Sequence, residues 1–177
     1  MSEALVSRIA ELERRVVELR RELSPPAAML PDRPAHYLEV CVGEVVYLVP
    51  VEPIREVLPA MWPAPLPDAP EWVRGTFRYG DVVVPLVDMG VRLHGLRREL
   101  ALSDVVVLLE SPAWMGLLAS AVGRVLHVTP DELAPPSPGI PQAPFLCGTR
   151  SGEHGEIAHL VAVTLLGREV LLDDDGR

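Results

Sequence analysis

Lysine and asparagine are absent from this sequence of 177 residues, so all 16 basic residues are arginine. Against them stand 25 acidic residues, and the formal net charge is −9 at pH 7. A nucleic-acid groove needs a basic face that neutralises phosphates, and an anionic membrane surface attracts basic segments. We therefore expect no nucleic-acid partner and no membrane surface as the main partner.

Cysteines and long apolar runs are also scarce. Cys41 and Cys147 lie far apart without CxxC spacing, which is typical of free thiols in a reducing compartment. No apolar stretch approaches the roughly 20 residues of a membrane span. The N-terminus alternates charged and apolar residues, unlike a signal peptide. We expect a cytoplasmic protein without direct membrane insertion.

Motifs for catalysis and metal binding are missing as well. No GxSxG elbow, Walker loop or GxGxxG follows a predicted strand. His154 and His159 are five positions apart with Gly155 between them, whereas zinc on a helix face needs a spacing of four. We expect no enzymatic activity, no metal site and no cofactor.

The segment RYGDVVVPLVDMG, residues 78–90, carries two aspartates that could suggest acid–base chemistry. If it is one strand, Asp81 and Asp88 point to opposite faces and lie about 23 Å apart along it. We therefore interpret them as the two ends of a strand. Pro85 removes a backbone donor within the segment, which predicts an edge strand or a bulge.

Residues 1–24 predict an amphipathic helix that ends at Ser24-Pro25-Pro26. Its apolar residues repeat at coiled-coil spacing and are Leu5, Ile9, Leu12, Val16, Leu19 and Leu23. Three interpretations stay open: a homodimer through this helix, a helix docked on its own domain, and a helix laid against a partner protein. Residues 25–35 are rich in proline and predict a semi-rigid linker.

From His36 onward the pattern changes to short strands separated by glycine and proline. Two apolar runs flank the Gly43-Glu44 turn and predict a hairpin, and further runs follow at regular spacing up to HLVAVTLLGREVLL. The segment PAMWPAPLPDAPEW carries too many prolines for a helix or a central strand. This spacing is typical of all-β barrels or sandwiches.

The order of these runs resembles the CheW-like coupling domain of bacterial chemosensory arrays. The pieces that carry the resemblance are VCVGEVVYLVPV, IREVL, LPDAPEWVRGTF, VVVPLVDM, VVVLLE, MGLLASAVGRVLHVTPDELAPPSP and HLVAVTLLG. The resemblance implies an all-β CheW-like domain over residues 36–177, formed by two SH3-like five-stranded barrels around a shared core, with the N-terminal α-helix outside it. The first barrel is expected over about 36–94 and the second over about 95–177.

The resemblance also implies a non-enzymatic scaffold that couples the cytoplasmic tips of methyl-accepting chemoreceptors to the regulatory domain of a CheA-type histidine kinase. The receptor-binding residues are then expected to include Ile54, Glu56 and Gly75, with Gly75 allowing a helix to approach closely. Kinase contact in the family involves exposed apolar residues, and Leu117, Leu118 and Val122 lie in the corresponding neighbourhood.

Two departures from the family pattern suggest a divergent member. Gly80-Asp81 stands where the family usually has Arg-Gly, so Glu56 loses its usual arginine partner unless Arg78 replaces it. Residues 118–122 read Leu-Ala-Ser-Ala-Val where Leu-Val-Asp-x-Val is common. We therefore expect specialisation for receptor binding, at Gly80 and Arg78 among others, with weak or no kinase coupling. The alternative is a dimeric structural connector outside kinase signalling.

Overall fold

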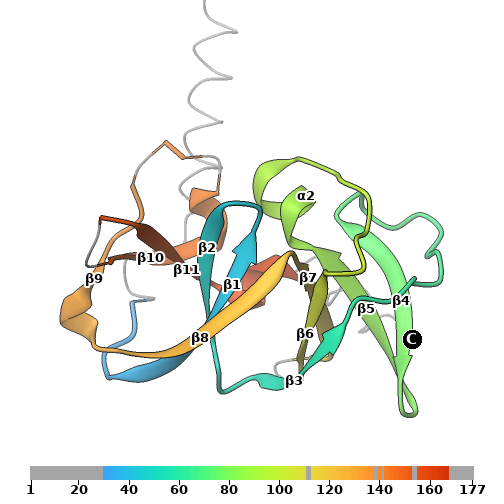
Figure 1. The fold of residues 1–177 in the computed structure, drawn as a ribbon, viewed down its shortest axis with the longest axis horizontal. Helices are drawn as coiled ribbons and strands as arrows, with labels where there is room; N and C mark the ends of the chain where they lie inside the picture. Colours follow the sequence, from blue (N-terminus) through green and yellow to red (C-terminus); the bar gives the residue numbers. More distant parts are fainter. Residues whose placement is uncertain (1–29, 111–112, 138, 141, 153–154, 168–177) are drawn as a thin grey trace, which may run out of the picture.

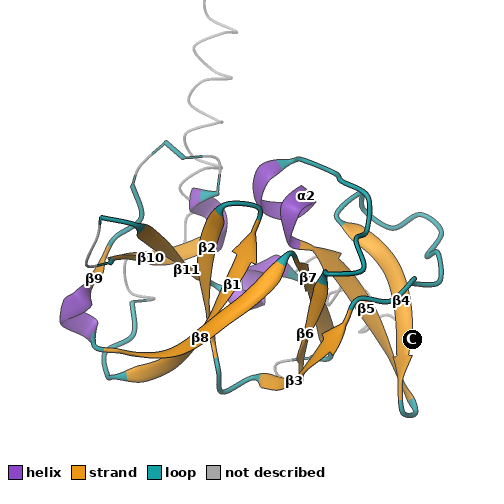
Figure 2. Cartoon of the chain, in the orientation of Figure 1, coloured by secondary structure: helices purple, strands orange, loops and turns teal. Residues whose placement is uncertain are grey.

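The computed structural model describes residues 30–110, 113–137, 139–140, 142–152 and 155–167. The predicted N-terminal helix with its apolar stripe and residues 25–29 of the linker lie outside the described residues, as does His154. Strands dominate the described part (Figures 1 and 2). They are β1 (Ala35–Val42), β2 (Val45–Pro50), β3 (Ile54–Pro59), β4 (Val73–Tyr79), β5 (Val82–Asp88), β6 (Val105–Leu109), β7 (Met115–Ala119), β8 (Ala121–Val128), β9 (Leu133–Ala134), β10 (Leu146–Ser151) and β11 (Ile157–Val161).

Short helical segments connect these strands. The α-helices are α2 (Met89–His94) and α3 (Val163–Leu166), and the 3₁₀ turns are η2 (Pro130–Glu132) and η3 (Ala143–Phe145). The strands form two sheets. Sheet A has six strands in the order β8-β1-β2-β11-β10-β9, and sheet B has five in the order β3-β6-β7-β5-β4.

Both sheets combine strands from the two halves of the chain. In sheet B, β7 runs parallel to β5, and in sheet A, β11 runs parallel to β2. The predicted boundary near residues 94 and 95 is therefore not the boundary between the sheets. A hairpin pattern in the sequence shows only which neighbours pair, whereas these parallel pairs join strands that are distant along the chain.

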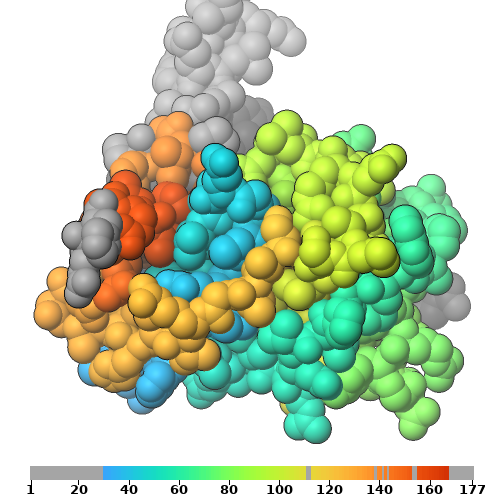
Figure 3. Space-filling view, in the orientation of Figure 1, coloured from blue at the N-terminus to red at the C-terminus, as the bar shows by residue number. Residues whose placement is uncertain are grey.

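The prediction of an all-β fold is confirmed, but the prediction of two closed five-stranded barrels is only partly right. Within the described residues, sheet A has six strands, and neither sheet is closed by backbone hydrogen bonds. The edges of sheet A are β8 and β9, while those of sheet B are β3 and β4. Strand β8 crosses the face shown in Figure 3 as a band in which most residues are exposed.

A shared apolar core joins the two sheets, as predicted. Val40 and Tyr47 from sheet A pack in the same cluster as Val87, Val107 and Leu117 from sheet B, and all five are fully buried. Each sheet also encloses a smaller cluster of its own. These smaller clusters contain Phe77, Val84, Leu86, Val106, Leu108 and Leu118 in sheet B, and Tyr37, Leu48, Val128 and Leu160 in sheet A.

Strand β6, with the sequence VVVLL, lacks polar residues because both of its faces are buried. Side chains alternate between the two faces of a strand. Val107 and Leu109 therefore enter the shared core, while Val106 and Leu108 enter the cluster of sheet B. A strand buried on both faces needs a continuous apolar run.

The two aspartates of the segment 78–90 do mark the ends of a strand. Tyr79 pairs with Val82, which leaves Gly80-Asp81 as a two-residue turn with Gly80 at a φ of 57°. Asp88 ends β5 and caps α2, because its Oδ1 accepts a hydrogen bond of 3.1 Å from the Val91 N–H. The two carboxylates therefore serve separate local purposes.

Of the two alternatives predicted for Pro85, an edge strand is wrong, because β5 lies between β7 and β4. The bulge of this strand pair lies in β4, between Val73 and Gly75, and not at Pro85. Pro85 stands opposite Thr76, whose backbone N–H and C=O are both used in hydrogen bonds with Ala64. Pairing with β7 begins only at Leu86. The missing N–H of Pro85 is therefore tolerated inside the sheet.

Candidate functional site

The predicted receptor-facing residues lie on the two edge strands of sheet B. Ile54 and Glu56 belong to β3, Gly75 and Arg78 belong to β4, and Gly80 forms the turn that follows. Although β3 and β4 are at opposite ends of the strand order, the sheet curls so that the Tyr79 hydroxyl of β4 donates a hydrogen bond of 2.7 Å to Glu56 Oε2. This side-chain contact bridges the open side of sheet B.

Tyr79, and not Arg78, is the partner of Glu56. Neighbouring residues of a strand point to opposite faces, so the face that carries Tyr79 toward Glu56 directs Arg78 away from it. Arg78 is exposed on the other face. Arg78 therefore does not take the place of the family arginine beside Glu56 in this structure, and nothing in the sequence pattern pointed to Tyr79.

Trp114 completes this cluster. Its ring lies 5.6 Å from the Tyr79 ring, centroid to centroid, at an interplanar angle of 36°. Both rings are partly buried against the core cluster of sheet B, whereas Glu56 is exposed. We call Glu56, Tyr79 and Trp114 the Glu56 patch.

Gly75 has an internal role instead of the expected role in receptor approach. Its φ is 139°, and a Cβ at this position would lie 2.1 Å from the carbonyl oxygen of Ala64. Ala64 exchanges two backbone hydrogen bonds, of 2.7 and 2.8 Å, with Thr76. The space above Gly75 is therefore filled by the proline-rich segment of the same chain. Pro63 and Pro65 on either side of Ala64 have no N–H to offer to another strand, which protects this edge of sheet B.

The apolar residues expected at a kinase contact do not form an exposed surface. Leu117 is 0% exposed and Leu118 4%, because Leu117 packs into the shared core and Leu118 packs into the cluster of sheet B on the opposite face. Val122 and Ile54 are half-buried and pack against the shared core. Leu117 and Leu118 are thus core residues, which the sequence did not reveal because a continuous apolar run does not show whether both faces are covered.

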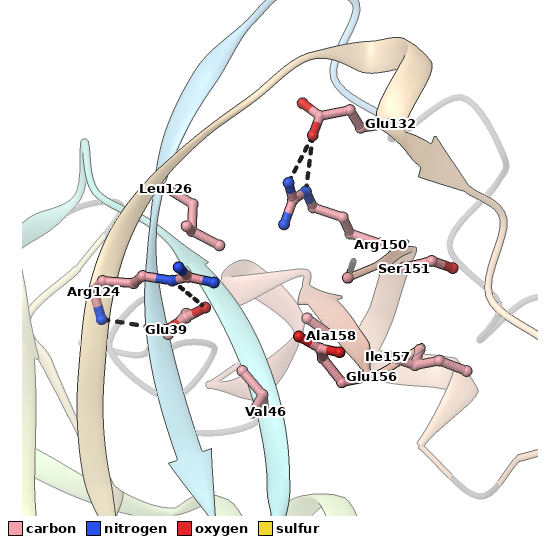
Figure 4. A pocket seen from close by; sticks show the side chains of 11 residues that line it. Glu39, Val46, Arg124, Leu126, Glu132, Arg150, Ser151, Glu156, Ile157 and Ala158 are labelled. Atoms are coloured by element: carbon pink, nitrogen blue, oxygen red, sulfur yellow. Dashed lines mark hydrogen bonds and ion pairs between the residues drawn. The ribbon is translucent and has the colours of Figure 1, made fainter. Parts of the chain in front are cut away.

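A cavity of about 500 Å³ is lined by residues of sheet A, from strands β1, β2, β8, β10 and β11 among others (Figure 4). Val46, Leu126 and Ala158 give it apolar walls. Two ion pairs lie around them: Arg124 Nε contacts Glu39 Oε1 at 3.3 Å, and Arg150 Nη2 contacts Glu132 Oε1 at 2.7 Å. In Figure 4 both guanidinium groups are held by glutamates across the same opening.

The second of these ion pairs is part of a turn. The Thr129 N–H and then the Arg150 guanidinium lower the pKa of Glu132 to about 2. Glu132 therefore fastens η2 to β10 on the side where sheet A is open. In each of these two ion pairs, the arginine and the glutamate beside the cavity neutralise each other's charge.

Two buried carboxylates fasten the loop that follows α2. Arg74 Nε donates to Asp88 Oδ2 at 2.6 Å, and Arg74 also donates to the Arg98 carbonyl. Arg98 in turn holds both oxygens of Asp104, at 2.7 and 2.8 Å. Burial alone would raise the pKa of Asp104, but the bonds from Arg98 and from the Ala101 N–H outweigh it and lower the pKa.

A histidine cluster joins α2 to sheet A. His94 Nε2 lies 2.9 Å from the Tyr47 hydroxyl, and His94 Nδ1 lies 2.9 Å from the Gln142 side-chain nitrogen. The His159 ring packs 5.7 Å from the Tyr47 ring. Burial lowers the pKa of His94, and burial together with the charge of His94 lowers the pKa of His159. Burial raises the pKa of Tyr47 to about 12.

We predict that the protein loses stability as the pH falls below about 6.5, the ordinary pKa of histidine. Because the folded pKa values of His94 and His159 are lowered, the unfolded chain takes up protons first, and acid favours unfolding. Urea unfolding at pH 7.5 and pH 5.5 measures the change. Replacing both His94 and His159 with glutamine should flatten this dependence, whereas His127→Gln on the exposed face of β8 should not. An equally steep dependence in the double variant would contradict the assignment.

Within the described ranges, no three histidine, cysteine or acidic side chains gather as metal ligands. The same part of the chain contains no helix that is long and apolar enough to cross a membrane.

Two curled sheets that share one core define this chain as an all-β module. The model of the CheW-like domain family matches residues 36–170, and the chain belongs to this family. The resemblance recognised in the sequence is thereby confirmed.

Individual relatives agree with this assignment. The chain is 23% identical over 100 residues to the chemotaxis protein CheW of Treponema pallidum (strain Nichols), covering 54% of this chain and 59% of that protein. It is 28% identical over 95 residues to the chemotaxis protein CheW of Rhizobium meliloti (strain 1021), covering 53% and 61%. The matched region thus spans about three-fifths of the length of these relatives.

A solved structure shows the same fold. The crystal structure of the scaffolding protein TtCheW from Thermoanaerobacter tengcongensis superimposes with a TM-score of 0.67 at 18% sequence identity. The match covers 75% of this chain and 87% of that chain. At this identity the similarity shows the arrangement of strands and not the partners.

Proposed function

We propose that this protein is a non-enzymatic, cytoplasmic scaffold of a bacterial chemosensory array, which couples chemoreceptor tips to a CheA-type histidine kinase. Membership of the CheW-like family, whose relatives are named for chemotaxis and scaffolding, supports this role. The single structural observation that carries the receptor side is Glu56, which is exposed on the edge of sheet B at the expected receptor-facing position.

Replacing Glu56 with arginine should abolish binding to the cytoplasmic tip of a chemoreceptor from the host while leaving the melting temperature unchanged. Among the described residues, Glu56 makes one exposed hydrogen bond, to Tyr79, and such a bond contributes about 1 kcal/mol or less. Isothermal titration calorimetry with a receptor tip fragment and thermal unfolding together check the prediction.

Glu44→Arg is the matched control, because it changes the charge equally at an exposed turn of sheet A. If Glu56→Arg binds the receptor tip like the wild type, Glu56 is not a receptor contact. A large fall in melting temperature would instead make Glu56 a structural residue.

We propose further that kinase coupling is weak or absent in this divergent member. The Gly80-Asp81 turn and the segment 118–122 support this proposal, because both depart from the family pattern. A pull-down of the full chain with the regulatory domain of the host kinase should recover little complex. Recovery equal to that of a typical family member would contradict the proposal.

A second candidate role is that of a dimeric connector joined through the N-terminal helix. The heptad spacing of Leu5, Ile9, Leu12, Val16, Leu19 and Leu23 favours it. Light scattering should then report a dimer for the full chain and a monomer for a chain that begins at Pro34. A full chain that is monomeric at micromolar concentration excludes this role.

A further inference from the structure

The Glu56 patch combines a carboxylate with two aromatic rings at the open side of sheet B. We infer that this patch is a subsite for an arginine side chain of the protein partner. The inference deepens the proposed receptor-binding role of this edge, and it names Tyr79 and Trp114 as the residues that decide which side chain is accepted.

Tyr79 holds the carboxylate in place. Its hydroxyl donates to Glu56 Oε2 at 2.7 Å, and among the described residues the structure records no partner for Oε1. The patch therefore presents an oriented carboxylate whose remaining hydrogen-bonding capacity faces solvent. A guanidinium group suits such a carboxylate because its N–H donors lie in a planar fork.

The aromatic rings add a second attraction for a cation. Tyr79 and Trp114 pack 5.6 Å apart and are anchored against the core cluster of sheet B together with Leu58 and Val82. The face of an aromatic ring attracts cations, most strongly for tryptophan, and a guanidinium can also stack flat upon it.

An arginine that stacks on aromatic rings also occurs within this chain. The Arg92 guanidinium lies 3.9 Å from the Trp72 ring centroid and 4.7 Å from that of Phe145. An arginine from a partner would meet a comparable aromatic surface at the Glu56 patch, with a carboxylate in addition.

The surrounding charges favour a cation over an anion. Arg55, which is next to Glu56 on β3, lies 3.9 Å from the counter-charge of Glu110. Arg78 is exposed and points away from the patch. The net charge of −9 also attracts a basic partner at long range. The patch thus fits a basic residue of the partner, and the planar geometry favours arginine over lysine.

A test that does not need the partner uses N-acetyl-arginine amide as the probe and its neutral isostere N-acetyl-citrulline amide as the control. The indole N–H resonance of Trp114 in the full chain, assigned by its loss in Trp114→Phe, reports binding by NMR. We expect the arginine compound to bind about fivefold more tightly than the citrulline compound, and Glu56→Gln to remove this difference. Equal responses to the two compounds, no response, or an unchanged preference in Glu56→Gln would each overturn the inference.

Tyr79→Phe separates the positioning role of the hydroxyl from ring stacking. It should keep a tryptophan response but lose most of the preference for arginine over citrulline, because Glu56 is no longer held. A Tyr79→Phe variant that keeps the full preference would overturn the role assigned to the hydroxyl. If the arginine preference is present but the chain does not bind receptor tips, the proposed function fails while the subsite stands.

Discussion

Replacing Asp88 with alanine is expected to lower the free energy of unfolding by about 3–5 kcal/mol. Asp88 is 4% exposed, and the side chain of its partner Arg74 is 13% exposed. Removing the carboxylate leaves a guanidinium buried without its counter-charge and also removes the cap of α2. Urea denaturation of the wild type and the variant measures the loss.

Asp81→Ala is the matched control. Asp81 is exposed in the two-residue turn at the other end of the same strand, so this substitution should change the stability by no more than about 0.5 kcal/mol. Equal effects of the two substitutions would contradict the separate roles that the structure gives to the two aspartates.

Replacing Leu117 with alanine should cost about 2–5 kcal/mol, the range for cavity formation in a packed core. Leu117 is fully buried in the shared core between the two sheets. Thermal and urea unfolding should show the loss. Leu102→Ala makes the same chemical change at a side chain that is 100% exposed, and it should be nearly neutral.

This pair of leucine variants also decides between two roles for Leu117. A kinase contact would make Leu117→Ala lower kinase binding with little effect on stability. A core residue produces the opposite result. Full stability in the Leu117→Ala variant would therefore contradict the packing described above.

Several features could be predicted from the sequence because they depend on local patterns. Alternation of apolar residues and turn residues at short intervals predicted an all-β fold, and the order of the runs identified the family. The ends of strand β5 also followed locally, since the spacing of Asp81 and Asp88 along one strand keeps them apart.

Other features depend on contacts between distant segments. Sequence patterns could not show that β2 pairs with β11 or that β5 pairs with β7, so they did not reveal that both sheets combine strands from the two halves of the chain. The role of Gly75 depends on Ala64 crossing above it. The burial of Leu117 depends on sheet A covering a face of sheet B.

The candidate site shows the same division most clearly. Local pattern and family resemblance were enough to select Glu56 and to notice that its usual arginine is missing. Its actual partner could not be found in this way, because Tyr79 reaches Glu56 only when sheet B curls and brings its two edge strands together. The sequence alone determines which side chains share a face of a strand, because successive side chains point to opposite faces. Only the tertiary structure decides which strand faces meet, because packing around the apolar cores sets the curvature of each sheet.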